Sequence, residues 1–242
     1  MQVQSVLFHP TEAYLLASAS FDKSVCLVDC RNGSSSLKVP IMSDPESLAW
    51  DPHNSNHLYS SLEDGSVICI DIRQATASPL FSFQAHDQTT SSISFSPNVP
   101  GLMATSSIDQ TVKIWDVKDV PSSSSRLPKL VGYKTMNVGK VFAMQFSIDV
   151  PYLLGCGGDG GLVGIWESDE LDAVQRHFSS RQSIDSSSLP SYIDLLAIDR
   201  GHDAAVATGD EVIMDAAGEV GASGEEVEAM KKDKKKKKKH NK

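Results

Sequence analysis

One phrase of sequence recurs four times in this chain: an apolar strand, a turn that holds an Asp, and a second apolar strand that ends in Asp or Trp. The copies run from Ser18 to Asp29, from Ser60 to Asp71, from Thr105 to Asp116 and from Gly155 to Trp166. The turn aspartates, Asp22, Asp64, Asp109 and Asp159, are 42, 45 and 50 residues apart. A period of about 40–45 residues is typical of a β-propeller blade. The pattern therefore predicts an all-β repeat protein, a class that generally presents binding surfaces and seldom catalyses reactions.

The register inside the copies is regular. Phe8, Trp50 and Phe95 each precede their turn Asp by 14 residues, and Phe146 precedes Asp159 by 13. Each of these aromatic residues ends an alternating apolar pair (Val6-Phe8, Leu48-Trp50, Ile93-Phe95, Met144-Phe146), and alternate residues of a strand face the same side. We therefore expect the four pairs to face a common core. With a looser fourth strand, the copies predict four-stranded blades at about 3–41, 46–83, 86–130 and 138–168, all within residues 1–168.

The third copy resembles the WD40 family. Ala85-His86 stands where that family has Gly-His, and Ile114-Trp115-Asp116 contains its signature dipeptide. In that family a His, a Ser or Thr, an Asp and a Trp form a buried hydrogen-bonded tetrad within a blade. The resemblance implies that His86, Thr105, Asp109 and Trp115 form this tetrad here.

The other three copies depart from the family pattern. The first has Val28 and the second Ile70 at the Trp position, while the fourth has Asp159 and Trp166 but Gly155 in place of the hydroxyl residue. We therefore expect strand pairing and core burial, more than the tetrad, to hold these blades together.

Within the family, the stretch from His9 to Asp29 and the segment from Phe81 to His86 are similar to the periodic tryptophan protein 1 subfamily. That resemblance implies a nuclear and nucleolar scaffold in ribosome biogenesis, rRNA processing or the chromatin of ribosomal genes. It also suggests that these four blades are the C-terminal half of a seven-bladed ring. A small four-bladed ring is the alternative, and half of a larger ring is expected to expose apolar faces and to be poorly soluble alone.

The cysteines and the apolar segments indicate an intracellular protein. Cys26, Cys30, Cys69 and Cys156 form no CxxC motif and read as reduced thiols, with no zinc ligands nearby. The N-terminus lacks the pattern of a signal peptide, and no apolar run approaches the length of a membrane span, so no membrane partner is expected.

After Trp166 the composition changes. Leu171, Val174 and Phe178 have helical spacing within residues 169–178 and predict a short helix packed on the last blade. A second apolar patch, residues 192–198, reads either as a docking helix, as the strand that completes an incomplete blade, or as part of a disordered tail. Docking segments are therefore expected within residues 169–199.

The end of the chain is strongly polarised in charge. Residues 194–228 hold ten acidic residues and one Arg, whereas residues 229–242 hold nine Lys and one Asp. Such blocks predict that residues 200–242 are disordered. The core of the basic run is Lys231, Lys232, Lys234, Lys235, Lys236, Lys237, Lys238 and Lys239. It has three readings: a nuclear or nucleolar address, a non-specific contact with RNA or DNA phosphates, or a solvated tail beside the acidic block.

The motifs that suggest catalysis have structural explanations. Residues 155–160 match GxGxxG, but the loop runs into a strand, whereas a dinucleotide site needs it to open a helix. His86, Thr105 and Asp109 contain a base, a hydroxyl and an acid, yet the hydroxyl lies on a strand inside a blade. We therefore expect no enzymatic activity and no cofactor.

What remains is protein binding. The turn residues Asp22, Lys23, Asp64, Asp109 and Gln110 are the predicted rim residues of the propeller. The excess of acid in the repeats favours basic partners such as histones, ribosomal proteins or assembly factors. A cytoplasmic adaptor, such as a substrate receptor of a ubiquitin ligase, is the alternative. Adaptors of that kind carry paired Trp-Asp-x-Arg motifs, which Asp29-Cys30-Arg31 and Asp71-Ile72-Arg73 approach without the Trp.

Overall fold

Sixteen strands arranged in four antiparallel sheets make up almost all of the regular structure in this computed structural model. The structure describes residues 2–32, 34–74, 78–118, 120, 127–181 and 213–215. Each sheet contains four strands that follow one another along the chain, so each sheet is one blade. The prediction of an all-β protein built from four propeller blades is confirmed.

The strands extend beyond the expected ranges in blade 3, which ends at Thr135, and in blade 4, whose last strand is at Ile213–Asp215. Blade 1 consists of β1 (Val3–Phe8), β2 (Leu15–Ser20), β3 (Ser24–Asp29) and β4 (Ser34–Pro40), and blade 2 of β5 (Pro45–Trp50), β6 (His57–Leu62), β7 (Ser66–Asp71) and β8 (Phe81–Gln84). Blade 3 consists of β9 (Thr90–Phe95), β10 (Leu102–Ser107), β11 (Thr111–Asp116) and β12 (Lys129–Thr135). Blade 4 consists of β13 (Val141–Phe146), β14 (Leu153–Gly158), β15 (Leu162–Glu167) and β16 (Ile213–Asp215).

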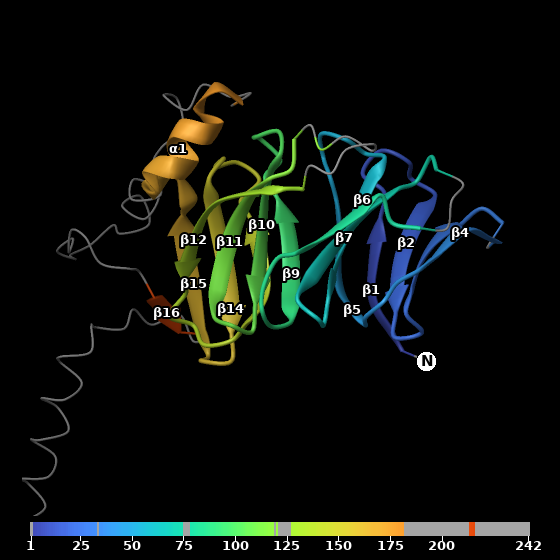
Figure 1. The fold of residues 1–242 in the computed structure, drawn as a ribbon, viewed down its shortest axis with the longest axis horizontal. Helices are drawn as coiled ribbons and strands as arrows, with labels where there is room; N and C mark the ends of the chain where they lie inside the picture. Colours follow the sequence, from blue (N-terminus) through green and yellow to red (C-terminus); the bar gives the residue numbers. More distant parts are fainter. Residues whose placement is uncertain are drawn as a thin grey trace, which may run out of the picture.

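The blades stand side by side in chain order, from blade 1 in blue to blade 4 in yellow and orange (Figure 1). Their first strands are neighbours, with β1 beside β5, β5 beside β9 and β9 beside β13. Three apolar clusters fill the spaces between blades 1 and 2, 2 and 3, and 3 and 4. Burial of apolar surface between successive blades is therefore the main force that stacks them.

The predicted core pairs are buried in three of the four copies. Trp50, Phe95 and Phe146 are all buried, whereas Val6 and Phe8 are each 59% exposed. The prediction was wrong for the first copy. In blades 2 to 4 the preceding blade covers this face of the first strand, and Val6 and Phe8 lie on the same face of β1. No blade lies on that side in the described part of the chain.

The second and third strands of every blade are joined by a turn of three residues. The third turn residue has a positive φ in all four: Lys23 at 57°, Gly65 at 86°, Gln110 at 72° and Gly161 at 69°. This left-handed conformation closes the tight hairpin and normally favours glycine. We call the end of the molecule that carries these turns the Asp-turn face.

In blade 4 the turn Asp stands one residue earlier, relative to the paired strands, than it does in the other three blades. Trp166 pairs with Leu154 as Trp115 pairs with Met103, so Cys156 occupies the position of Thr105. This register corrects the assignment of Gly155 to the hydroxyl position. It also makes Asp159 the first turn residue, where blade 3 has Ile108, so that Asp159 is not the counterpart of Asp109.

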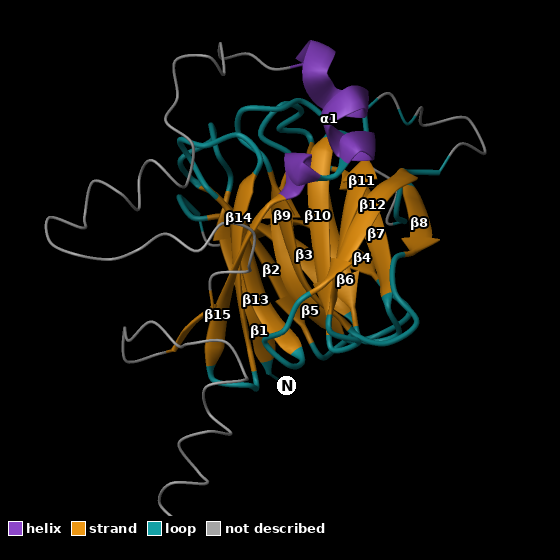
Figure 2. Cartoon of the chain, turned by 90° about the vertical axis from the view of Figure 1, so that its left-hand side faces the viewer, coloured by secondary structure: helices purple, strands orange, loops and turns teal. Residues whose placement is uncertain are grey.

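A short helical segment lies at the opposite end of the blades, which we call the helix face (Figure 2). It consists of the 3-10 turn η1 (Ser168–Glu170), the helix α1 (Asp172–Phe178) and the 3-10 turn η2 (Ser179–Arg181). Val174 and Phe178 are fully buried, and Leu171 packs on the same cluster. The helix expected within residues 169–178 thus packs against blades 3 and 4 through the three apolar residues of its pattern.

The fourth strand of blade 4 comes from far along the chain. β16 pairs with the first half of β15, from Leu162 to Gly164. The apolar patch at residues 192–198, the Lys run and most of the predicted disordered tail lie outside the described residues. No helix in the described ranges has the length and apolar character needed to cross a bilayer.

Candidate functional site

The four residues expected to form the tetrad lie together inside blade 3. His86 enters from the connection before β9, and its Nδ1 lies 2.9 Å from Asp109 Oδ2. Its Nε2 lies 2.8 Å from Thr105 Oγ1, which also accepts a hydrogen bond from Trp115 Nε1 at 2.9 Å. One chain of hydrogen bonds therefore connects the Asp turn to the last residue but one of β11.

Burial and hydrogen bonding together determine the protonation states of His86 and Asp109. Burial lowers the pKa of His86, despite the opposing effect of Asp109, so the imidazole is neutral at pH 7. In the neutral ring, Nδ1–H donates to Asp109 and Nε2 accepts from the Thr105 hydroxyl. Burial acts to raise the pKa of Asp109, but hydrogen bonds from Thr111 and His86 outweigh it and keep that pKa below its usual value.

This arrangement resembles a catalytic triad in composition but not in access. His86 is 1% exposed and Thr105 is fully buried. The Thr105 hydroxyl is hydrogen-bonded to both His86 and Trp115. A nucleophile, by contrast, needs an open site beside an oxyanion hole. The tetrad therefore serves the structure of blade 3.

The turn aspartates mainly organise their own turns. Asp22, Asp64 and Asp109 each accept a hydrogen bond from the hydroxyl two residues later, at distances of 2.5 Å from Ser24, 2.6 Å from Ser66 and 2.6 Å from Thr111. Asp159 instead accepts from the backbone N–H of Lys140 at 2.7 Å. Such side-chain bonds stabilise tight turns. Of the predicted rim acids, Asp64 is exposed and keeps its second carboxylate oxygen free of any bond to a described residue.

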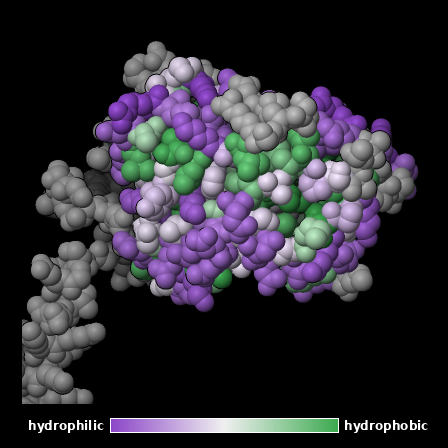
Figure 3. All heavy atoms as spheres, in the orientation of Figure 1, coloured by the Kyte–Doolittle hydropathy of each residue, from purple (hydrophilic) through white to green (hydrophobic). Residues whose placement is uncertain are grey.

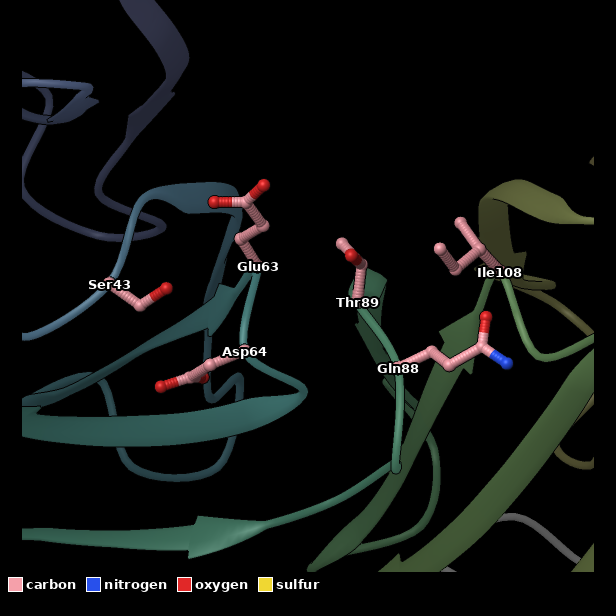
Figure 4. Close-up of a pocket in the computed structure, with 6 residues that line it drawn as sticks. All are labelled: Ser43, Glu63, Asp64, Gln88, Thr89 and Ile108. Carbon is pink, nitrogen blue, oxygen red and sulfur yellow. The ribbon is translucent and has the colours of Figure 1, made fainter.

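A shallow, open pocket of about 410 Å³ lies on the Asp-turn face between blades 2 and 3. Ser43, Glu63 and Asp64 lie on one side of it and Gln88, Thr89 and Ile108 on the other, and the Asp64 carboxylate is directed away from the second group (Figure 4). We call this cavity the mouth pocket. Hydrophilic residues cover most of this edge of the molecule (Figure 3). The rim residues Lys23 and Gln110, predicted from their turns, are not among those that line the pocket.

Acidic groups crowd this part of the surface. Burial raises the pKa of Glu46, and the neighbouring carboxylates of Glu63 and Asp44 raise it further against a hydrogen bond from Gln4. No described residue forms an ion pair with Glu63, which is exposed. The pocket therefore presents uncompensated negative charge, which attracts cationic ligands.

The helix face carries arginines that are paired with the acid at the end of the third strand in blades 1, 2 and 3. Arg31 contacts Asp29 through Nε and Nη2 at 3.0 and 2.6 Å, and Arg73 contacts Asp71 in the same way at 3.0 and 2.7 Å. The two arginine side chains are 67% and 61% exposed. Adjacent blades thus display the same planar ion pair.

Blade 3 completes this pattern with a residue from the helical segment. Asp116 accepts from both terminal nitrogens of Arg181, at 2.7 and 2.9 Å, and lies 2.7 Å from His177 Nε2. Burial acts to raise the pKa of Asp116, but the hydrogen bonds from Arg181 and His177 outweigh it and lower the pKa to about 2. Sequence reasoning missed this site because its members are 61 and 65 residues apart and share no motif.

Other kinds of site are not apparent in the described part of the chain. No three or more His, Cys, Asp or Glu residues there are placed to hold a metal ion. All four cysteines are free, and burial raises the pKa of the Cys69 thiol to about 12 and that of Cys156 to about 11. These two thiols are therefore unreactive at neutral pH.

Four-stranded blades stacked through their faces define the class of β-propeller repeat proteins. The family model of the WD domain, G-beta repeat, matches residues 1–29 and 77–116, which include most of blade 1 and most of blade 3. These matched stretches are similar to the WD40 repeat, and proteins built from that repeat generally bind other proteins.

Three curated relatives illustrate the similarity. An uncharacterized WD repeat-containing protein, C17D11.16, of Schizosaccharomyces pombe is 35% identical over 143 residues, which are 58% of this chain and 26% of that protein. The periodic tryptophan protein 1 homolog of Drosophila melanogaster is 28% identical over 162 residues, or 65% of this chain and 34% of the relative. The DDB1- and CUL4-associated factor 13 of Xenopus laevis is 26% identical over 172 residues, which are 71% of this chain and 36% of that protein. The chain thus spans about a quarter to a third of the length of these relatives, and similarity to the periodic tryptophan protein 1 subfamily is confirmed.

Proposed function

We propose that this chain is a non-catalytic scaffold of ribosome biogenesis that holds a basic segment of a partner protein in the mouth pocket. The main support for the proposal is that carboxylates without an ion-pair partner line a pocket at the junction of two blades. Charge steers a basic segment to this face, and the cavity gives it a place to dock.

The walls of the pocket suit a long cationic side chain. Glu63 and Asp64 offer carboxylate oxygens on one wall, while Thr89 and Ile108 offer methyl groups on the other. Lys and Arg side chains bury their methylene stems on apolar surface while the charged head reaches an acceptor. None of the six lining residues is aromatic, so the pocket lacks the cage that recognises methylated lysine. Unmodified lysine or arginine is therefore the favoured ligand.

A binding assay tests the mouth pocket. We expect a fluorescent Lys- and Arg-rich peptide, such as a histone tail peptide, to bind with an affinity that falls as salt rises. Glu63→Gln combined with Asp64→Asn is expected to weaken binding about tenfold, because two partners for charged hydrogen bonds are lost. Asp149→Asn on the helix face is the matched control and should leave the affinity unchanged. Equal affinity of the double variant and the wild type would refute a role for the pocket.

The assignment to ribosome biogenesis draws support from the resemblance to the periodic tryptophan protein 1 subfamily and from the polybasic run at residues 231–242. We propose that this run directs the chain to the nucleus and nucleolus and contacts RNA phosphates there without sequence preference. Basic partners such as histones, ribosomal proteins or assembly factors fit the acidic blades. Tagged chains with and without residues 230–242, each with and without RNase, test this proposal. Diffuse cytoplasmic signal from both chains would refute it.

The helix face favours a second candidate function. Arg31 and Arg73 form matching, exposed ion pairs on adjacent blades, and one relative is named a DDB1- and CUL4-associated factor. This repetition suits an adaptor that docks on a ubiquitin ligase through its arginines. Co-purification with DDB1 that is lost in an Arg31→Ala, Arg73→Ala double variant but kept in Arg176→Ala would support the adaptor. Absence of DDB1 from the purified complex would exclude it.

A further inference from the structure

A second cavity, of about 330 Å³, lies on the helix face between blades 2 and 3. Its lining includes Asp51, His53, His57, Tyr59, Val117 and Lys118. Its volume is at the lower end of the range of small-molecule binding sites, about 300–1,000 Å³. It is separate from the mouth pocket, which opens at the other end of the same two blades.

The carboxylate of Asp51 is the acidic group of this cavity. Asp51 is 7% exposed, and its Oδ1 accepts backbone hydrogen bonds from His53 at 2.8 Å and from Asn54 at 3.2 Å. Its Oδ2 accepts no hydrogen bond and forms no ion pair with any described residue. Because Oδ2 is not among the fully buried atoms that lack a partner, it is in contact with solvent at the cavity wall and can accept a hydrogen bond from a ligand.

Flat rings form another part of the wall. The His57 and Tyr59 rings have centroids 6.5 Å apart at 68°, and one His57 ring nitrogen lies 3.1 Å from Asn54 Nδ2. Burial lowers the pKa of His57, so its ring is neutral at pH 7 and does not repel a cation. A planar guanidinium can stack on one such ring while it donates a hydrogen bond to a carboxylate oxygen, whereas an ammonium group stacks less well.

We propose that this cavity is a binding site for the guanidinium group of an arginine side chain presented by a partner protein. The guanidinium donates to Asp51 Oδ2 and lies against the ring of His57, because the Tyr59 ring is 1% exposed and packs against Phe81 and Phe95. Lys118 is exposed, so its ammonium group can turn to solvent or donate to the backbone carbonyl of the bound arginine. The site is separate from the mouth pocket, and it lies beside the Asp71–Arg73 ion pair, since His57 is the strand partner of Asp71.

Nuclear magnetic resonance of the full chain with labelled histidine tests the site, with N-acetyl-arginine amide as the probe. We expect saturable shifts of the His57 and His53 ring signals, with a dissociation constant in the millimolar range. Asp51→Asn keeps an oxygen that accepts from His53 and Asn54 but removes the charge, and it should weaken binding at least about tenfold. Asp149→Asn, in the corresponding connection of blade 4, is the matched control and should bind as the wild type does.

Two further measurements separate the proposal from its alternatives. Lys118→Glu adds a carboxylate beside the cavity and is expected to tighten binding, a change that loss of folding cannot imitate. Glu63→Gln, in the mouth pocket, should leave the His57 shifts unchanged, so that failure of one site is distinguishable from failure of the other. Absence of saturable shifts up to about 50 mM probe, equal binding by Asp51→Asn, or equal binding of N-acetyl-lysine amide would each overturn the proposal.

Discussion

The clamp between Asp116 and the helical segment makes a measurable contribution to stability. Asp116 is 8% exposed and accepts hydrogen bonds from Arg181, from His177 and from the backbone N–H of Lys118. A pKa lowered from the usual 3.8 to about 2 corresponds to about 2 kcal/mol of stabilisation when the carboxyl is ionised. Asp116→Asn removes the charge but keeps the shape of the side chain. We therefore expect it to reduce the free energy of unfolding by about 2 kcal/mol at pH 7.

The sign of the pH dependence follows from the lowered pKa. A carboxyl with a lowered pKa in the folded state stabilises the protein above its unfolded pKa, and the contribution is lost as pH falls through the folded value. The difference between wild type and Asp116→Asn should therefore be constant from pH 7 to pH 5. It should shrink between the usual value of 3.8 and about 2. Urea unfolding at a series of pH values, followed by tryptophan fluorescence, measures this difference.

Asp29→Asn is the control that isolates the effect of burial. The pKa of Asp29 is also lowered to about 2, mainly by its hydrogen bond with Arg31, but that arginine side chain is 67% exposed. Solvent screens exposed pairs, so the loss of stability in Asp29→Asn should be clearly smaller than in Asp116→Asn. Equal losses in the two variants, or a loss in Asp116→Asn that persists unchanged at pH 2, would refute the reasoning.

Three further substitutions test the internal structure of the blades by thermal or urea unfolding. Thr105→Val removes the hydroxyl at the centre of the tetrad and should lower the free energy of unfolding by about 2–4 kcal/mol, because two buried nitrogens lose their partner. Ser60→Ala is the comparison in blade 2. It should lower the free energy of unfolding by less than about 1 kcal/mol, because the Ser60 hydroxyl makes one hydrogen bond, of 3.4 Å. Gly65→Ala should cost about 2 kcal/mol or more, since φ is +86° and a Cβ there would lie 2.2 Å from a backbone oxygen. Cys156→Ser should stabilise blade 4 by about 1 kcal/mol by giving the buried, unpartnered Nε1 of Trp166 an acceptor, and a lower melting temperature would contradict this.

Much of the fold is predictable from the sequence because the repeat specifies it locally. Each three-residue turn places its Asp or its left-handed residue at a fixed distance from the strands. The side-chain alternation then determines which face is buried. His86 was assigned to the tetrad by resemblance and lies within hydrogen-bonding distance of Thr105 and Asp109.

The features that the sequence did not predict correctly have a common cause. They depend on which strand residues pair with each other, or on contacts between residues far apart in the chain. The one-residue offset of blade 4 changes the roles of Gly155 and Asp159, and a count along the chain does not reveal which strand residues are opposite each other. The clamp on Asp116 needs a helical segment from beyond the next blade. The free oxygen of Asp51 becomes evident only when the donors around it are known, because Trp50-Asp51-Pro52 reads in sequence as an ordinary strand end.

Blade 3 stands apart from the other blades in a way that connects structure to binding. In the described part of the chain it is the blade with the full tetrad, and it also supplies one wall of each cavity: Thr89 and Ile108 to the mouth pocket, Val117 and Lys118 to the cavity on the helix face. A hydrogen-bonded chain from the Asp turn to Trp115 holds both ends of this blade in a fixed relation. Binding constellations require walls held by such supporting bonds. Thr105→Val is therefore expected to weaken ligand binding at both ends of the blade, although Thr105 lines neither cavity.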